Sequence, residues 1–491
     1  MPAPPRLSGH LLRSSAAAGV AVLTAVLLAT APFGSAQPAR VETREGDQPA
    51  RPRLVQAAEA AEAAEAPARP PRPRSTEPDF AAYTPPPPLP GEGAPVTITG
   101  RGWGHSVGMS QYGAQAQALD GLSHSEILAH WSPGTQITTD PRAESGILVN
   151  LFLTRDGDAT RLEVQAHGGP GAEPVTVDGG GARAQHLASP TAWTLRHDGE
   201  RFVLTGAEGE VIDQGPGPVR VGFGTGERPS LLRLPQLARR GGLAGVFRWG
   251  SLTVTVADDG HLQPVLHLPV ELYLRGLAEM PSGWQPEALA AQAIAGRGYA
   301  VRRLAEGVDP GCGCHLGTTP HDQAYDGWAK EAGRFGDRWR AAVAATAGRV
   351  LTYDGELAWT YYSSSHGGRT EASGDSWAYP ETLPYLPSVE DPWSADPDVG
   401  NPMAAWTRTV SNEDFSRAVG MARVLAVSVA ERTEGGAPKT LIVRGLTDHG
   451  REIVLEFRGW RKGIAGADLK LALHSQLPSM QIDSITVGQE P

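Results

Sequence analysis

Glu279 is the acidic residue whose neighbours in the sequence most favour acid–base chemistry. It lies in the segment 268–281, directly between Ala278 and Met280 and shortly before a predicted helix. A carboxyl group in apolar surroundings loses the solvation of its charged form, so its pKa rises toward the range that suits a general acid. The alternative is that Glu279 only supplies negative charge near the N-terminus of that helix.

Two other segments are rich in glycine and polar side chains. Residues 100–113 read GRGWGHSVGMSQYG, and five glycines in fourteen residues indicate a loop that needs positive φ angles or close backbone approach. A structural turn around a buried histidine is the alternative for this segment. Residues 361–371 read YYSSSHGGRTE. Three serines beside a histidine suggest a serine hydrolase, but the segment lacks the G-x-S-x-G elbow of such enzymes, and a polar loop lining a carbohydrate cleft fits it better.

The two cysteines of the chain, Cys312 and Cys314, stand one residue apart and close to His315, His321 and Asp322. One intervening residue disfavours a disulfide between them. Two thiolates and an imidazole would suit zinc, although structural zinc sites typically space their cysteines as C-x-x-C. Two unpaired thiols in a loop are the alternative.

The composition limits the kind of protein that carries these residues. A chain of 491 residues has room for two or three domains, and 40% hydrophobic with 20% charged residues is ordinary for a soluble globular protein. The formal net charge of -11 speaks against a dedicated nucleic-acid binder, which would normally show a basic face. Two cysteines also exclude a scaffold built on many disulfides.

The N-terminal part predicts export followed by a spacer. Residues 1–36 combine a weakly basic start, an apolar run and small residues before Ala36, which is the pattern of a cleavable signal peptide; an uncleaved membrane anchor is the alternative. We therefore expect a secreted or cell-wall-associated protein. Residues 37–95 are rich first in Ala and Glu and then in Pro, which predicts a disordered linker with an extended polyproline stretch. A ligand for a proline-recognising module is the alternative for this stretch.

From about residue 96 the pattern predicts an α+β fold rich in strands. A helix is expected over residues 286–304, because Pro286 and Glu287 favour a helix start and alanines dominate the rest. A short helix over residues 414–419 is expected to be capped by Ser411 or Asn412. β-Branched and aromatic runs between turn residues predict strands: 147–153, 161–166, 202–204, 219–223, 251–256, 350–353, 359–363, 425–429, 441–444 and 453–457.

These segments together resemble the SpoIID/LytB family, named for the stage II sporulation protein D and for an amidase-enhancer protein. The family patterns run approximately GWGHGVGMSQYGA, LPLEEYLRGVVAGEMP, KAQAVAARTYA and YSSSSGGYTE. This chain reads GWGHSVGMSQYGA, LPVELYLRGLAEMP, LAAQAIAGRGYA and YYSSSHGGRTE. The resemblance extends over roughly residues 96–490.

The resemblance implies a lytic transglycosylase that acts on peptidoglycan glycan strands stripped of peptide stems. Members like the sporulation protein cleave the β-1,4 link between N-acetylmuramic acid (MurNAc) and N-acetylglucosamine (GlcNAc). The essential glutamate of the family's GEMP motif corresponds to Glu279. One carboxyl group suffices for this reaction: it protonates the glycosidic oxygen, and its conjugate base then helps the muramyl C6 hydroxyl to attack C1, leaving a 1,6-anhydro end. Glycoside hydrolysis would usually require a second carboxylate, for which Glu371 and Asp375 are the first candidates.

The order of the motifs departs from the family pattern. GWGH closes the domain of the sporulation protein but begins it here, so the chain resembles a circular permutation. We expect the N-terminal part of the SpoIID-like domain at residues 96–139, an inserted or elaborated β region at 140–245 and the main part at 246–491. Ser106 replaces a glycine of the family pattern, and Gly296 and Gly298 replace residues of its AART segment.

The resemblance also suggests the remaining site residues and partners. The residues expected to contact glycan strands are His105, Gln111, Tyr112, Arg275, Ser364 and Ser365. Some family members carry zinc near a Cys/His cluster, which here corresponds to Cys312, Cys314 and, as third ligand, His321 in preference to His315. Any such zinc would be structural, because the reaction requires no cofactor. Two alternatives stay open: a non-catalytic, wall-bound enhancer of a peptidoglycan amidase, and a metal-dependent hydrolase built on the cysteine cluster.

Overall fold

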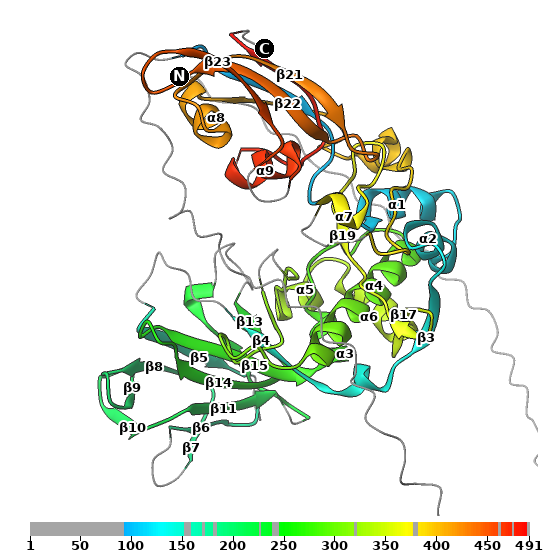
Figure 1. Ribbon diagram of the computed structural model, residues 1–491. Coiled ribbons are helices and arrows are strands. Elements are labelled where there is room, and N and C mark those ends of the chain that lie inside the picture. Colours follow the sequence, from blue (N-terminus) through cyan, green and yellow to red (C-terminus); the bar gives the residue numbers. More distant parts are fainter. Residues whose placement is uncertain are drawn as a thin grey trace, which may run out of the picture. The chain divides into compact units, whose positions relative to one another are not determined.

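The computed structural model describes residues 93–151, 159–168, 172–179, 184–224, 227–237, 245–318, 322–376, 382–459, 463–473 and 476–488 (Figure 1). All of them belong to one compact unit, Phe80–Pro491. The predicted signal peptide and nearly all of the predicted linker lie outside the described residues. Among the helices that are described, none has the length and apolar character needed to cross a membrane.

A helical part surrounds the long helix α4, Pro286–Glu306. This helix begins after Gln285 with Pro286 in its first turn, as the sequence predicted, and ends at Gly307, whose φ of +87° takes the chain out of the helix. Helices α1, α2, α3 and α6 and strand β17 pack against α4. The bounds of the other helices here are α1 Gln111–Leu119, α2 His124–Trp131, α3 Val270–Arg275, α5 Trp328–Ala332, α6 Gly336–Ala345 and α7 Ser373–Ser376.

Two larger sheets form the all-β part. One has the strand order β10-β9-β8-β5-β12-β13 and the other β16-β4-β15-β14-β11-β6-β7. Their strands are β4 Gly146–Asn150, β5 Arg161–His167, β6 Val175–Asp178, β7 Gln185–Leu187, β8 Thr191–His197, β9 Phe202–Gly206, β10 Val211–Gly215, β11 Val219–Gly224, β12 Leu231–Arg233, β13 Val246–Phe247, β14 Gly250–Val256, β15 Leu262–Pro269 and β16 Leu316–Gly317. Alternate residues of both sheets are buried in one hydrophobic core, so the sheets pack face to face. Apart from β16, the strands of this part end by Pro269.

A smaller sheet joins the two ends of the described chain. Strand β1, Val96–Gly100, lies between β20, Trp406–Val410, and β24, Ile482–Val487, antiparallel to both. Next to it, β21 Arg423–Arg432, β22 Pro438–Leu446 and β23 Glu452–Phe457 form an antiparallel meander with helices α8 Asn412–Val419 and α9 Ala465–Ala472. Among the further short strands, β17 Arg349–Tyr353 lies between β3 Gln136–Thr139 and β18 Glu356–Leu357, and β2 Met109–Ser110 pairs with β19 Tyr362–Ser363.

The structure confirms a mixed α+β, strand-rich fold, and it corrects two local predictions. The short helix expected over residues 414–419 is present as α8. Its cap is Ser411, one of the two residues expected, because the Ser411 Oγ accepts the Asp414 amide hydrogen at 3.0 Å. The strand expected over residues 359–363 is restricted to Tyr362–Ser363. The glycine-rich segment 100–113 does not end as a loop: Ser110 caps helix α1, which starts at Gln111.

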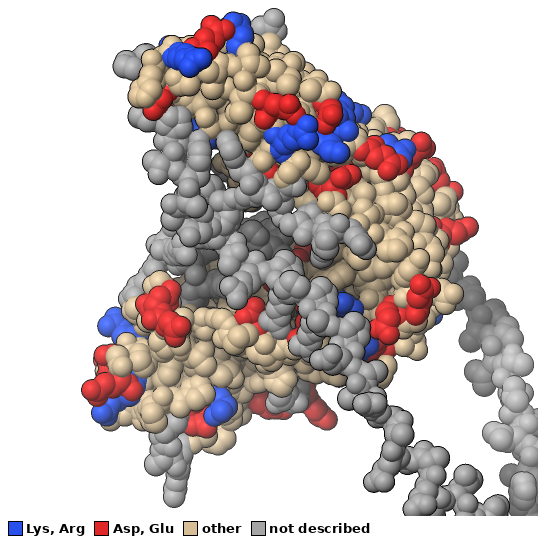
Figure 2. Space-filling model, in the orientation of Figure 1, with Lys and Arg blue, Asp and Glu red and all other residues tan. Residues whose placement is uncertain are grey.

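Acidic and basic side chains are mixed on the face of the molecule that Figure 2 shows. No large area of one sign stands out among the described residues on that face.

Candidate active site

Glu279 lies in the loop between α3 and α4, where it is held by a second loop from further along the chain. Its Oε1 accepts a hydrogen bond from the Ala324 amide at 2.5 Å. The neighbouring Ala278 amide donates to the Ala324 carbonyl oxygen at 2.8 Å, and Leu277 forms a bridge with Tyr325. These backbone contacts fix the carboxyl group of Glu279 on a rigid support.

Burial raises the pKa of Glu279 from its ordinary value of 4.5 to about 7. Hydrogen bonds from the Ala324 amide and the Tyr362 hydroxyl and the nearby Lys330 ammonium oppose this rise, whereas the Asp326 carboxylate adds to it. A carboxyl group whose pKa lies near neutral pH exchanges its proton readily there, which is the property of a general acid and base. The apolar neighbours of Glu279 in the sequence thus predicted the direction of this pKa shift correctly.

A chain of buried hydrogen bonds orients the hydroxyl group that reaches Glu279. The Tyr273 hydroxyl donates to the Gln323 Oε1 at 3.0 Å, and the Gln323 Nε2 donates to the Tyr362 hydroxyl oxygen at 2.8 Å. Because the Tyr362 oxygen accepts from Gln323, its own hydrogen remains for the carboxyl group of Glu279. Sequence analysis missed all three residues as parts of the site, although Tyr362 lies within the second polar segment.

The two polar segments come together in the structure. Strands β2 and β19 pair in parallel, and the Tyr112 amide donates to the Ser364 carbonyl oxygen at 3.0 Å. Trp103 forms a backbone bridge with Ser365. Gly104, with a φ of +120°, is required at this junction, because a Cβ there would lie 2.3 Å from the Ser363 Cβ. Through Tyr362 this paired unit also reaches Glu279.

The residues predicted to contact glycan strands differ in their exposure. Gln111 is only 6% exposed, and its Nε2 donates to the Gln292 Oε1 at 3.1 Å, which joins α1 to α4. Ser365 is fully buried. His105, Tyr112 and Ser364 are half-buried. Burial and the neighbouring His366 lower the pKa of His105 to about 3, so its imidazole is neutral at physiological pH.

The Arg275 side chain lies near Trp249 and Glu331. Its guanidinium carbon lies 5.9 Å from the centre of the Trp249 ring, and the carboxyl group of Glu331 is a charged neighbour. Among the contacts of the described residues, none joins Arg275 to Glu279.

Several aromatic rings lie among the residues of these motifs. Trp359 and Tyr361 are stacked, with ring centres 5.2 Å apart and planes 5° apart, and the Arg302 guanidinium covers Trp359. Tyr112 meets Trp284 edge to face at 4.9 Å. The four aromatic side chains and Arg302 are all half-buried, so each keeps part of its surface open to solvent.

Cys312 and Cys314 form a disulfide bond, which corrects the sequence prediction against pairing. Their Cα atoms lie 5.2 Å apart, within the usual range for a disulfide, because Gly313 turns the chain with a φ of +59°. Paired sulfurs offer no thiolate to zinc. In addition, the Nδ1 of His315 accepts the Leu148 amide hydrogen at 2.9 Å. The predicted third ligand, His321, lies outside the described residues, and within them no group of residues could hold a metal ion. The cysteine pair in this state therefore does not fit a zinc site.

The second carboxylates named from the sequence do not lie beside Glu279. Glu371 is fully buried elsewhere, where its Oε1 accepts hydrogen bonds from Thr433, Ala437 and Gln481. Asp375 interacts with Glu371 and is absent from the charged neighbours of Glu279. The carboxylate near Glu279 is Asp326, which sequence analysis did not select.

Comparison with known proteins finds relatives of the part of the chain that carries Glu279. The model of the family described as SpoIID, Stage II sporulation protein, matches residues 258–353, which include Glu279, Gln323 and Lys330. Stage II sporulation protein D of Bacillus subtilis is 30% identical over 205 residues, covering 39% of this chain and 58% of that protein. The same protein of Bacillus amyloliquefaciens is 30% identical over 203 residues, covering 38% of this chain and 57% of that protein.

A second kind of relative is the amidase enhancer of Bacillus subtilis. It is 35% identical over 137 residues, covering 28% of this chain and 16% of that protein. The chain thus spans a little over half the length of its sporulation relatives and a small part of the enhancer. Residues 258–353 match the SpoIID family model, and parts of the chain are similar to stage II sporulation protein D and to the amidase enhancer.

Proposed function

We propose that the protein is an exported lytic transglycosylase that cleaves the β-1,4 bond between MurNAc and GlcNAc in peptidoglycan glycan strands. The observation that carries this proposal is the environment of Glu279: burial raises its pKa to about 7, and Ala324 and Tyr362 donate hydrogen bonds to its carboxyl group. Glu279 and Ala324 lie within the residues that match the SpoIID family model. The similarity to stage II sporulation protein D supports the resemblance from which this activity is proposed.

The reaction requires one proton donor that later accepts a proton. Glu279 gives its proton to the glycosidic oxygen as the bond from that oxygen to the muramyl C1 breaks. The resulting carboxylate takes the proton of the C6 hydroxyl while the C6 oxygen bonds to C1. The products are a 1,6-anhydro end and a free hydroxyl on the leaving sugar, and no water is consumed.

The surroundings of Glu279 suit both halves of this cycle. Burial favours the protonated form before the bond breaks, while the Tyr362 hydroxyl and the Lys330 ammonium stabilise the carboxylate that forms afterwards. Burial also lowers the pKa of Lys330 to about 8. Tyr362 and Lys330 act here by stabilising charge, and neither has to transfer a proton.

The half-buried aromatic side chains support a glycan as the substrate. Pyranose rings bury apolar C–H groups against aromatic faces and edges, and the Trp359–Tyr361 and Tyr112–Trp284 pairs offer such surfaces. We place the sugars on these half-buried rings together with Ser364 and His105, and we assign Gln111 and Ser365 to the support of the loops.

A second candidate function is that of a wall-bound enhancer of a peptidoglycan amidase. The similarity to the amidase enhancer of Bacillus subtilis favours it. In that case Glu279 would hold a ligand without transferring a proton. Export through the N-terminal signal peptide is part of both proposals.

Cleavage by a Glu279→Gln variant separates the two functions. We would incubate the purified protein with peptide-free glycan strands and identify the products by mass spectrometry. Loss of the acid should slow the release of anhydro-muramyl products by about 100-fold or more. Glu144→Gln, the same change at an exposed residue, is the matched control and should cleave like the unchanged protein.

Two results would contradict the proposed enzyme. Unchanged cleavage by Glu279→Gln would remove Glu279 from the reaction. Binding of glycan without any cleavage by the unchanged protein would favour the enhancer.

A further inference from the structure

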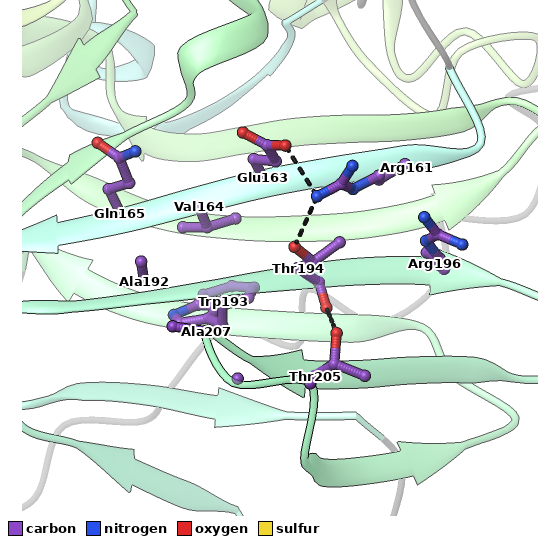
Figure 3. A pocket seen from close by; sticks show the side chains of 12 residues that line it. Arg161, Glu163, Val164, Gln165, Ala192, Trp193, Thr194, Arg196, Thr205 and Ala207 are labelled. Atoms are coloured by element: carbon purple, nitrogen blue, oxygen red, sulfur yellow. Dashed lines mark hydrogen bonds and ion pairs between the residues drawn. The ribbon is translucent and has the colours of Figure 1, made fainter.

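Outside the candidate active site, the disulfide between Cys312 and Cys314 carries chemistry that no step of the proposed reaction uses. Another polar feature there is a pocket lined by residues of β5, β8, β9 and the turn after β9 (Figure 3). Its Arg161 Nη2 lies 2.9 Å from the Glu163 Oε1 and donates to the Thr194 hydroxyl oxygen at 3.4 Å, so the protein itself supplies partners for that charge. The disulfide, in contrast, is a bond that an incoming thiol can break.

The ring that this disulfide closes is too small to contribute much to the stability of the fold. The two cysteines are separated by a single residue, and the entropy that a cross-link removes from the unfolded chain grows with the length of the closed loop. The chain has only these two cysteines, so a thiol reagent can act at no other place. The pair is therefore better suited to reaction than to holding the fold together.

The two cysteines differ in burial. Cys314 is only 2% exposed, whereas Cys312 is half-buried between the exposed residues Gly311 and Gly313. A thiolate that approaches from solvent therefore meets Cys312 first, and Cys314 becomes the leaving group. Exposed disulfides are those that thiols reduce readily, whereas structural disulfides resist reduction.

The turn that contains the ring has little local preference for its shape once the disulfide is open. Gly311 and Gly313 flank Cys312, and glycine loses more conformational freedom on folding than any other residue. Backbone hydrogen bonds support the turn: the Asp309 amide donates to the Cys314 carbonyl oxygen at 2.8 Å, and the Cys312 amide donates to the Asp309 carbonyl oxygen at 3.3 Å. Opening the ring should weaken both, because it frees the glycines between them.

The residues directly after the ring are attached to strand β4. The His315 amide donates to the Leu148 carbonyl oxygen at 2.8 Å, and the His315 Nδ1 accepts the Leu148 amide hydrogen at 2.9 Å. Strand β16 then pairs with β4 in parallel. The Gly317 amide donates to the Asp322 Oδ2 at 2.8 Å, so the end of β16 holds the side chain of Asp322.

Asp322 leads directly to the support of Glu279. Its Oδ1 accepts a hydrogen bond from the Tyr299 hydroxyl at 2.8 Å, which ties it to helix α4. The next two residues are Gln323, which donates to the Tyr362 hydroxyl oxygen, and Ala324, whose amide donates to the Glu279 carboxyl group. A path of hydrogen bonds and chain connections thus runs from the disulfide ring to Glu279.

We propose that the Cys312–Cys314 disulfide is an exchange site for the dithiol of a partner oxidoreductase, and that its reduction loosens the segment that supports Glu279. One thiolate of the partner attacks the Cys312 Sγ, and the electron pair of the broken S–S bond leaves on the Cys314 Sγ, which takes up a proton. The second thiol of the partner, as thiolate, then attacks the partner's sulfur in the mixed disulfide. Cys312 is released as a thiol, and the partner is oxidised to a disulfide.

This inference rests on the export that is part of the proposed function, because stable disulfides form outside the reducing cytoplasm. It requires no step of the cleavage reaction.

Reduction of the folded chain tests the exchange site. Dithiothreitol is the dithiol probe, a chelator keeps metal ions from the released thiols, and alkylated cysteines are counted by mass spectrometry. We expect both cysteines to be labelled without denaturant, at a rate within about tenfold of that of the urea-unfolded chain, and with an unchanged circular dichroism spectrum. A rate further below that of the unfolded chain, or loss of the fold on reduction, would show a structural disulfide and overturn the proposal.

Amide hydrogen exchange tests the loosening. The amides of His315, Gly317 and Ala324 each donate a hydrogen bond on the path to Glu279. We expect them to exchange about tenfold faster in the reduced protein than in the oxidised protein, with no change for the amides of β22. Equal exchange of the three amides in both states, or an equal increase in β22, would overturn the proposal.

The matched control is Cys312→Ser combined with Cys314→Ser, which cannot close the ring. Its three amides should exchange at the fast rate with and without dithiothreitol. Slow exchange in this variant would show that the ring does not hold the segment, and it would also overturn the proposal.

These measurements do not use cleavage, so the two proposals can fail separately. A protein that exchanges thiols and loosens as expected but cleaves no glycan would retain the exchange site and exclude the transglycosylase. Cleavage that depends on Glu279, in a protein whose disulfide resists dithiothreitol, would retain the transglycosylase and exclude the exchange site.

Discussion

At the scale of single residues, the site depends on how strongly one carboxyl group is removed from water. Glu279 is half-buried between two loops, and the hydrogen bonds that it accepts from Ala324 and Tyr362 offset only part of the cost of its burial. The same burial that disfavours the ionised form of Glu279 also keeps its carboxyl group protonated, as the proposed reaction requires. A fully exposed glutamate would be ionised at neutral pH and would have no proton to donate.

The pH dependence of cleavage should report this carboxyl group. Because Glu279 must start protonated, the rate should fall as pH rises through about 7. Tyr362→Phe removes a hydrogen bond that favours the carboxylate, so the falling limb should move to higher pH. The measurement is the initial rate of cleavage between pH 5 and 9 for both proteins.

Tyr385→Phe is a suitable control for that experiment, since the Tyr385 hydroxyl accepts from the Trp359 amide and is not among the groups that shift the pKa of Glu279. Its falling limb should coincide with that of the unchanged protein. A limb near the ordinary glutamate pKa of 4.5, or one that Tyr362→Phe leaves in place, would contradict the assignment of Glu279 as the acid.

Sequence reasoning at this scale succeeded where the cause was local. The apolar neighbours Ala278 and Met280 correctly indicated a carboxyl group with a raised pKa. Tyr362 and Gln323 come from segments more than forty residues further along the chain, so no local pattern linked them to Glu279. The disulfide was missed because the conformation of Gly313, which brings its two neighbours together, is set by the folded loop.

At the scale of elements, helix α4 positions the loop that carries Glu279. Arg297 is fully buried, and its guanidinium holds the Glu271 carboxylate through two hydrogen bonds of 2.7 and 2.9 Å. This pair ties α4 to α3, the helix that leads to Glu279. A buried charge that lost its partner would destabilise the fold by about 3–5 kcal/mol, so the pair fixes where α3 ends.

The two glycines of α4 that depart from the family pattern have a packing reason. A Cβ on Gly296 would lie 2.6 Å from the Leu277 Cδ2, and one on Gly298 would lie 2.7 Å from the Thr360 Oγ1. Thr360 precedes the segment that carries Tyr362, and its hydroxyl donates to the Ala295 carbonyl oxygen at 2.6 Å. The glycines therefore let α4 approach both segments that hold the site.

Gly298→Ala should lower the free energy of unfolding by about 1–3 kcal/mol, because the added methyl group overpacks the contact with Thr360. Helix propensity alone would give the opposite sign, a gain of about 1 kcal/mol. Urea unfolding of the single variants and of Gly298→Ala combined with Thr360→Ala measures the coupling. The double variant should lose less than the sum of the two, and a stabilising Gly298→Ala would show that the close approach is unimportant.

At the scale of the whole molecule, the sequence predicted the class of the fold better than it predicted which strands pair with each other. Alternating and apolar runs correctly indicated helices α4 and α8 and a strand within each of the ten segments named for one, because these patterns are local. Other strands, such as β8 and β15, were not predicted. The position of β1 between β20 and β24 depends on contacts such as Val96 with Val410 and Val487, separated by more than three hundred residues. The register of these strands depends on which buried faces pack together in the folded protein. It therefore could not be predicted from the sequence of any one strand.

This long-range pairing also explains how the first motif reaches the site. Arg101 and Gly102 follow β1 and donate backbone hydrogen bonds to the carbonyl oxygens of Gln481 and Met403. The GWGH segment is thereby anchored to the C-terminal part of the chain and directed toward the second polar segment. A motif that begins the domain in sequence thus lies beside one that comes more than two hundred and fifty residues later.

The central claim is that one carboxyl group cleaves a glycan without water, and the origin of the new oxygen atoms tests it most directly. Peptide-free glycan strands would be cleaved by the unchanged protein in water enriched in heavy oxygen, and the new ends would be weighed by mass spectrometry. We predict anhydro-muramyl ends that carry no heavy oxygen. Reducing ends that carry it would show that water attacks C1, contradict the transglycosylase and direct attention to Asp326 as the second carboxylate.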